Sequence, residues 1–493
     1  MPYAPVGTRE GSAGTLTQAP PPHTRWFILV AFALNSGANA FLFMDFATTP
    51  DATKQLYGFC SPSDGDSDGS KVGRGSCEDA GGPFVQSTYS ASLLAVVPSA
   101  IFVMIYIDRF NYVVSTMGIS CNCTGAWLRW YSASVAAAGS HSLGRWLAIG
   151  SSALVGFAAA VCIVSYSSIS VRWFPKHERT FATTCAVQSN YLGWAFGAVI
   201  FPYAIETTHD LLDVLFYQAC VFTLFFLLYA ALYRDNPTLH AAQHGSQHGS
   251  FALKVRTLYS SKQYVLQCMC YAVLAGVSFA IPSFQTTAFQ KLDLTARDAA
   301  WTNFSFIFAG VSTGMLLGRL CTSPAYFSRT LKIMFLGTSL SLAGLIAMSW
   351  CQGLVPHRVF YGGLIFLMLA CGATSLGFIG IALSAVVETT HPVSPELSGG
   401  TVEWWVQIWG FVLSEASGSF ADGQYAFPIC GAATWLVTLL MFTGYRQEFN
   451  KSQGLDRGGG DGRVHGQEYK LIATADAAGS VQVSSTDAFP DNP

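Results

Sequence analysis

The sequence predicts an all-α integral membrane protein with twelve transmembrane helices in two six-helix bundles. Only 11% of its residues are charged and 51% are hydrophobic, whereas soluble domains usually carry about 25% charged residues. Apolar segments long enough to cross a bilayer recur along the chain. A polar interval divides these segments into two sets of six. Too little charge is present to cover a water-facing surface, so most of the outer surface is expected to face lipid.

The first six spans follow residues 1–25, a polar Gly-, Pro- and Thr-rich segment that we expect to be disordered and cytoplasmic. They form an N-terminal bundle over residues 26–233, with a polar outer loop at 47–84. Each span is predicted from its length and its lack of charge. The spans are 26–46, 85–107, 112–131, 145–168, 181–204 and 211–233.

A cytoplasmic linker, residues 234–262, is rich in His, Gln, Ser and Gly and precedes the C-terminal bundle at 263–444. The tail at 445–493 is rich in Gly, Asp and Ser, a composition typical of cytoplasmic disorder. The spans of the second bundle are 263–284, 299–320, 331–350, 359–382, 399–420 and 427–444.

The distribution of Lys and Arg predicts the orientation. With both termini in the cytoplasm, the inner segments hold eighteen of the 26 Lys and Arg residues and the outer segments hold eight. Positive residues are enriched on the cytoplasmic side of membrane proteins. The distribution of Lys and Arg does not distinguish the plasma membrane from an endolysosomal or vacuolar membrane. We expect the protein to be a monomer.

Several function classes are disfavoured. The net charge of −2 and the absence of a basic stripe argue against a nucleic-acid partner. No nucleophile with a base, no usable pair of carboxylates and no cofactor loop is found, so we expect neither an enzyme nor a cofactor. His240, His244 and His248 are spaced like metal ligands on a helix, but Gly245 and Gly249 disfavour that helix. No metal site is therefore predicted.

Two further features lie outside the spans or at their ends. Cys60 and Cys77 flank an acidic stretch on the outer side, where a disulfide is predicted. Asp108 and Arg109 follow the second span and Arg319 follows the eighth, which is the equivalent place in the other half. These charges are interpreted as a cytoplasmic gate; alternatively, they mark the ends of spans.

Polar side chains inside spans are costly and usually face an interior or a water-filled path. Asn35 and Asn39 lie four residues apart on one face of the first helix, and Phe43 continues that face. Asn190 is the corresponding polar residue of the fifth span. Both Asn39 and Asn190 have two interpretations: a contact with a solute, or a hydrogen bond between helices.

The eleventh span carries Glu403 and Gln407, again four residues apart. A buried carboxylate there could exchange protons or attract a cationic solute. Alternatively, Glu403 lies near enough to the start of the span to reach the membrane interface. Asp45 closes the first span and is expected at its outer rim.

Four short motifs resemble the feline leukaemia virus subgroup C receptor-related family, a branch of the major facilitator superfamily. They are RWFILVAFALNSGANAF at 25–41, CTGAWLRW at 123–130, WFPKHER at 173–179 and ETTHPVSPELSGG at 388–400. The resemblance spans both halves of the chain. It implies the major facilitator fold, in which two bundles rock around a central site.

That family includes carriers of choline and ethanolamine, a proposed haem exporter and a pyridoxine carrier. For the choline carriers the resemblance implies an aromatic cage, whose first-span Trp falls here at Phe43 and whose seventh-span Tyr falls at Phe279. An eleventh-span Gln of those carriers falls at Gln407, whereas their fourth-span Gln is absent here, with Ala159 near its place. The expected function is transport of a small organic solute, cationic or zwitterionic, with a choline-like solute weakly favoured. The alternative is a transport-inactive receptor or scaffold that retains the fold.

Overall fold

The structure is a computed structural model. It describes residues 22–60, 81–107, 111–232, 251–290, 292, 296–351, 353–391, 393–419 and 426–445. Throughout these ranges the regular elements are helices. Residues 1–21 and 446–493 of the segments predicted to be disordered, most of the outer loop and most of the linker lie outside the described residues. Residues 22–25, also predicted to be disordered, instead form the first turn of a helix.

Six long helices form the first half. The first begins at Pro22, four residues before the predicted span, and a short helix, α2 (Pro50–Leu56), follows it in the outer loop. The six are α1 (Pro22–Thr48), α3 (Gly81–Tyr106), α4 (Asn111–Ala137), α5 (His141–Trp173), α6 (Lys176–Ala204) and α7 (Thr208–Leu232).

The second half begins after a ten-residue helix, α9 (Phe251–Ser260), that occupies the end of the predicted linker. A short 3-10 turn, η1 (Pro324–Tyr326), precedes its third span. The spans are α10 (Lys262–Gln290), α11 (Ala296–Leu320), α12 (Phe327–Trp350), the pair α13 (His357–Ser375) and α14 (Ile379–Thr390), α15 (Pro395–Ser419) and α16 (Ala426–Thr443).

Nine segments among the described residues are long and apolar enough to cross a membrane. Three more helices, α4, α6 and α15, have 27, 29 and 25 residues but carry more polar side chains. They pack among the other nine, and two of them line the cavity described below. Together the twelve spans confirm the predicted all-α membrane fold.

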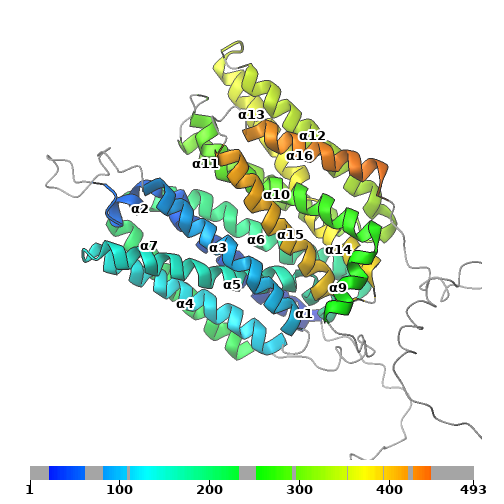
Figure 1. The fold of residues 1–493 in the computed structure, drawn as a ribbon, viewed down its shortest axis with the longest axis horizontal. Coiled ribbons are helices and arrows are strands. Elements are labelled where there is room, and N and C mark those ends of the chain that lie inside the picture. The colour runs from blue at the N-terminus through cyan, green and yellow to red at the C-terminus, as the bar shows by residue number, and fades with distance from the viewer. Residues whose placement is uncertain are drawn as a thin grey trace, which may run out of the picture. The chain divides into compact units, whose positions relative to one another are not determined.

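The two halves are defined by their packing. In the first, α1 packs along α6, and α5 packs along both α3 and α4; in the second, α10 packs along α15 and α16, and α11 along α13. In Figure 1 the blue to teal helices gather on one side and the bright green to orange helices on the other. The halves meet where α6 contacts α11 and α14, and where α3 and α5 contact α15.

The tenth span is interrupted, although the sequence predicted one continuous helix over 359–382. The α-helix stops at Ser375 and resumes at Ile379. The backbone carbonyls freed by the break are bonded by side chains of other helices: Ser278 Oγ donates to Ser375 O at 2.8 Å, and Gln188 Nε2 donates to Leu376 O at 3.0 Å. Irregular backbone is tolerated at membrane depth when neighbouring helices satisfy it in this way.

The expectation that Asp45 lies at an exposed rim is wrong. Asp45 is 1% exposed and forms an ion pair at 2.8 Å with Arg129 of α4, whose side chain is 2% exposed. Arg129 also donates to Leu42 O and to the hydroxyl of Ser152, and its guanidinium lies over the ring of Phe46. A charge paired and hydrogen-bonded on all sides can be buried, whereas an isolated one cannot.

Candidate functional site

A cavity lies between the two halves, near the middle of the helices. It is lined from the first half by α1, α3, α5 and α6, and from the second half by α10 and α15. Its volume is about 30 Å³, which is room for one or two water molecules. All six residues predicted to contact a solute line it: Asn39, Phe43, Asn190, Phe279, Glu403 and Gln407.

Asn39 combines the two interpretations left open by the sequence. Its amide nitrogen donates to Asn122 Oδ1 at 2.7 Å and to Val155 O at 3.1 Å, and Asn122 in turn donates to Asn35. These bonds hold α1 against α4 and α5. The Asn39 carbonyl oxygen has no hydrogen-bond partner in the described structure, although it is buried. That oxygen is therefore available to accept a hydrogen bond from a solute in the cavity.

Asn190 is held in a similar way. Its amide nitrogen donates to the backbone oxygen of Ser36 at 3.0 Å and reaches the hydroxyl of Ser36 at 3.3 Å. The bond fixes α6 to α1 and keeps the Asn190 side chain at the cavity wall. Helix packing and exposure to a solute are thus compatible at this residue.

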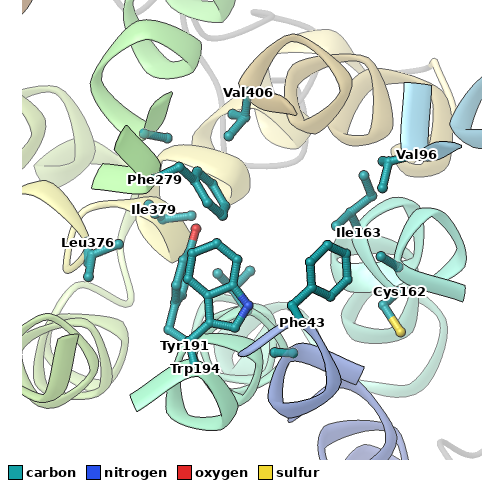
Figure 2. Packing of buried hydrophobic residues seen from close by; sticks show 14 of the residues in the cluster. Phe43, Val96, Cys162, Ile163, Tyr191, Trp194, Phe279, Leu376, Ile379 and Val406 are labelled. Atoms are coloured by element: carbon teal, nitrogen blue, oxygen red, sulfur yellow. The ribbon is translucent and has the colours of Figure 1, made fainter. Parts of the chain in front are cut away.

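Aromatic rings cover much of the cavity wall. The Phe279 ring lies 4.8 Å from Trp194 and 5.9 Å from Tyr191, measured between centroids. Figure 2 shows these three rings facing Phe43 and Ile163 across a common space. Because Phe279 comes from α10 and the other rings come from the first half, this wall is formed by both halves. Aromatic faces of this kind attract organic cations.

The polar residues of α15 complete the site. Glu403 is 3% exposed, and one of its carboxylate oxygens accepts a hydrogen bond from the Tyr271 hydroxyl of α10. The α-helix begins at Pro395, four residues before the predicted span, so Glu403 lies two turns inside the helix. Gln407 lies one turn further along and makes no hydrogen bond to another described side chain.

The sequence-based prediction missed several lining residues. Tyr166, Trp194, Leu93 and Ile163 also face the cavity. Trp194 could have been found, since it lies four residues after Asn190 on the same helical face. The other three, Tyr166, Leu93 and Ile163, lie in long apolar segments. There the position along the helix does not show whether a side chain faces the cavity or the lipid.

The halves are closely joined on the inner side, defined as the side on which α1 begins and α7 ends. Arg172 of α5 donates two hydrogen bonds to Glu396 of α15, at 2.7 and 3.0 Å. Ser167 Oγ donates to Pro395 O at 3.1 Å, and Trp404 Nε1 donates to Val97 O at 3.0 Å. These contacts lie between the cavity and the inner surface. They close that end of the path between the halves.

A glycine permits this approach of α15 to α5. A Cβ atom at Gly399 would lie 2.5 Å from the Ser167 hydroxyl oxygen. Real side-chain contacts are not this short, so a side chain here would displace the Ser167 hydroxyl from its bond to Pro395 O, and glycine avoids that displacement. On the outer side, the indole nitrogen of Trp301 donates to the Tyr203 hydroxyl at 3.0 Å.

The predicted gate and disulfide are only partly described. Asp108 and Arg109 lie outside the described residues. The Arg319 guanidinium of α11 lies 6.0 Å from the ring centroid of Phe181 in α6, so this residue does reach the other half. Cys60 is disulfide-bonded. Cys77 lies outside the described residues, so its pairing with Cys60 stays a prediction.

Comparison with known proteins agrees with this architecture. The family described as the Major Facilitator Superfamily matches residues 28–414. The choline/ethanolamine transporter FLVCR1 of Felis catus is 23% identical over 442 residues, which are 84% of this chain and 71% of that protein. The choline/ethanolamine transporter flvcr2a of Danio rerio is 21% identical and covers 91% of this chain and 92% of its own length.

Solved structures share the fold. The E. coli fucose:proton symporter FucP superposes with a TM-score of 0.59 at 13% identity, covering 85% of this chain and 98% of that one. A bacterial homologue of the iron transporter ferroportin, in an outward-facing state, gives a TM-score of 0.61 at 11% identity, with the same coverage of 85% and 98%. At these identities the similarity shows the fold alone.

Proposed function

The chain belongs to the Major Facilitator Superfamily, and from that premise we propose that it carries a small organic cation or zwitterion across a membrane by alternating access. The observation that carries the proposal is the meeting of a buried carboxylate, Glu403, with aromatic rings in one cavity between the halves. A cationic head group loses its hydration shell when it leaves water. The carboxylate and the aromatic faces together must replace those lost interactions.

The lining supports an alkylammonium solute with a hydroxyl or a similar polar group. Phe43, Phe279 and Trp194 provide aromatic faces for the ammonium end. The free carbonyl oxygen of Asn39 and the amide of Gln407 can bond a polar end. Choline and ethanolamine have this chemistry, and the similar proteins FLVCR1 and flvcr2a are named for transporting them.

Alternating access is supported by the size of the cavity and by the contacts around it. A space of about 30 Å³ is too small for such a solute, so the halves must separate to admit it. The bonds from Arg172 to Glu396 and from Ser167 to Pro395 would break when the inner side opens. Rocking of two bundles about a central site is the usual motion of such folds.

We further propose that both termini are cytoplasmic and that the carrier works as a monomer, without a cofactor and without chemical change to the solute. The linker at 234–262 would connect the two bundles. The gate charges Asp108, Arg109 and Arg319 would lie on the cytoplasmic side. The orientation rests on the excess of Lys and Arg in the inner segments.

Uptake by purified protein in liposomes tests the proposal. Choline and ethanolamine should accumulate in protein-containing vesicles and not in empty ones. Phe279→Leu keeps the apolar volume but removes the aromatic face, so choline affinity should fall between about twofold and thirtyfold. Phe366→Leu is the matched control, because Phe366 is 68% exposed on the same bundle. Folded protein that takes up neither solute would favour the receptor or scaffold alternative.

A further inference from the structure

Glu403 is a buried carboxylate with no cationic partner among the described residues. The side chains that interact with it electrostatically are Tyr166 of α5, Tyr191 of α6, and Tyr271 and Cys268 of α10. Tyrosine and cysteine are ordinarily uncharged at neutral pH. The Tyr271 hydroxyl donates one hydrogen bond to the carboxylate, and this bond does not cancel its charge.

The other helices packed on α15 bring no compensating charge. The sequences of α3 and α16 contain no Lys, Arg, His, Asp or Glu. Glu388 of α14 interacts with Arg179 at the inner end of the molecule. Arg172 of α5 is bonded to Glu396, about two helical turns before Glu403. The charge on Glu403 is therefore left to be balanced by something that enters the cavity.

An ionised carboxylate is costly to bury, so this group must be neutralised whenever the cavity is closed to water. Two species can do this: a proton bound to Glu403 itself, or the ammonium of a solute lying against it. We propose that the two alternate, so that the protein exchanges one organic cation for one proton through Glu403. This inference rests on the proposed function and adds to it the coupling ion.

The exchange balances in protons and in charge. When the cavity is open to one side, the arriving cation displaces the Glu403 proton, which leaves to that same side. After the halves have moved, a proton from the opposite side protonates the carboxylate and releases the cation there. Each cycle moves one positive charge in each direction, so net charge transfer is zero. The bare carboxylate is not carried through the closed state, because its burial is unfavourable, and this limits uncoupled leakage.

Transport by purified protein in liposomes distinguishes this exchange from simple facilitated diffusion. With radiolabelled choline outside, an acidic interior should drive accumulation by about tenfold per pH unit. An inside-negative membrane potential should have no effect, whereas a uniported cation would accumulate about fiftyfold at 100 mV. Accumulation driven by the potential and indifferent to the pH gradient would overturn the exchange and leave the proposed function intact. Absence of choline and ethanolamine uptake under every gradient would reject both.

A binding measurement assigns the coupling to Glu403. In weakly buffered detergent solution across the acid to neutral range, choline should release up to one proton per molecule bound to the wild-type protein. Glu403→Gln should abolish this release, and Glu403→Asp, which keeps a carboxylate, should retain it. Glu415→Gln is the matched control on the same helix and should release protons like the wild type. Proton release that persists in folded Glu403→Gln would overturn the assignment.

Discussion

Arg172 donates two hydrogen bonds, at 3.0 and 2.7 Å, to the same carboxylate oxygen of Glu396. The pair joins α5 of the first half to α15 of the second. Glu396 is 1% exposed on its side chain and Arg172 is 11% exposed. Hydrogen bonds to charged groups in such surroundings contribute about 1.5–3 kcal/mol. The pair is thus strong enough to bias the two halves toward closure on the inner side.

Arg172→Gln should shift the protein toward opening on the inner side. A loss of about 1.4 kcal/mol or more corresponds to a tenfold or greater increase in the open population. Ser394→Cys places a thiol at a position that is 7% exposed in the closed structure. Its alkylation, followed at that residue by mass spectrometry, should be faster in the Arg172→Gln background. Arg329→Gln, at an exposed arginine, serves as the control, and equal rates in both backgrounds would contradict a gating role.

Gly399→Ala should impair transport by obstructing inner closure, since its Cβ would lie 2.5 Å from Ser167 Oγ. Ser167→Gly removes the obstructing hydroxymethyl group and should restore uptake in the double variant. Gly362→Ala is the control, because nothing lies within 4 Å of a Cβ added there. Initial rates of choline uptake are compared for the wild type, Gly399→Ala, the Gly399→Ala/Ser167→Gly double variant and Gly362→Ala. Failure of Ser167→Gly to rescue would show that the close approach is not what limits Gly399→Ala.

Asp45→Leu or Arg129→Leu alone should destabilise the first half by about 3–5 kcal/mol, because each leaves a buried charge without its ion-pair partner. The double variant should be more stable than either single one. Thermal unfolding in detergent is the measurement. Asp51→Leu, at an exposed residue of α2, should have little effect. Additive losses in the double variant would mean that the two charges do not stabilise each other.

Gln188→Met should destabilise the interrupted tenth span, since it removes the side-chain donor to Leu376 O from the other half and leaves that carbonyl only the 3.4 Å bond from Ile379 N. The net contribution of one such hydrogen bond is about 0.5–1.5 kcal/mol. Faster backbone amide exchange at residues 376–379, measured by mass spectrometry, is the expected result. Gln55→Met, at an exposed glutamine of α2, is the control. Unchanged exchange at the break would assign its stability to packing instead.

The sequence alone determined the number of spans, the division into halves and the identity of the family. Span length and missing charge are local properties of the chain, and lipid imposes them directly on each segment. Helical spacing also placed Asn39 with Phe43, and Glu403 with Gln407, on common faces. Because polar side chains in a bilayer turn toward the interior, all six predicted residues meet at one cavity.

The tertiary structure alone decided which residues are partners. Asp45 was expected at a rim, yet Arg129, 84 residues away, makes its burial possible. Nothing local pairs Tyr271 with Glu403 or Arg172 with Glu396, which lie 132 and 224 residues apart. The break after Ser375 likewise depends on donors from α6 and α10. Helical periodicity fixes which face a side chain occupies, but the residue opposite it is set by how the helices pack.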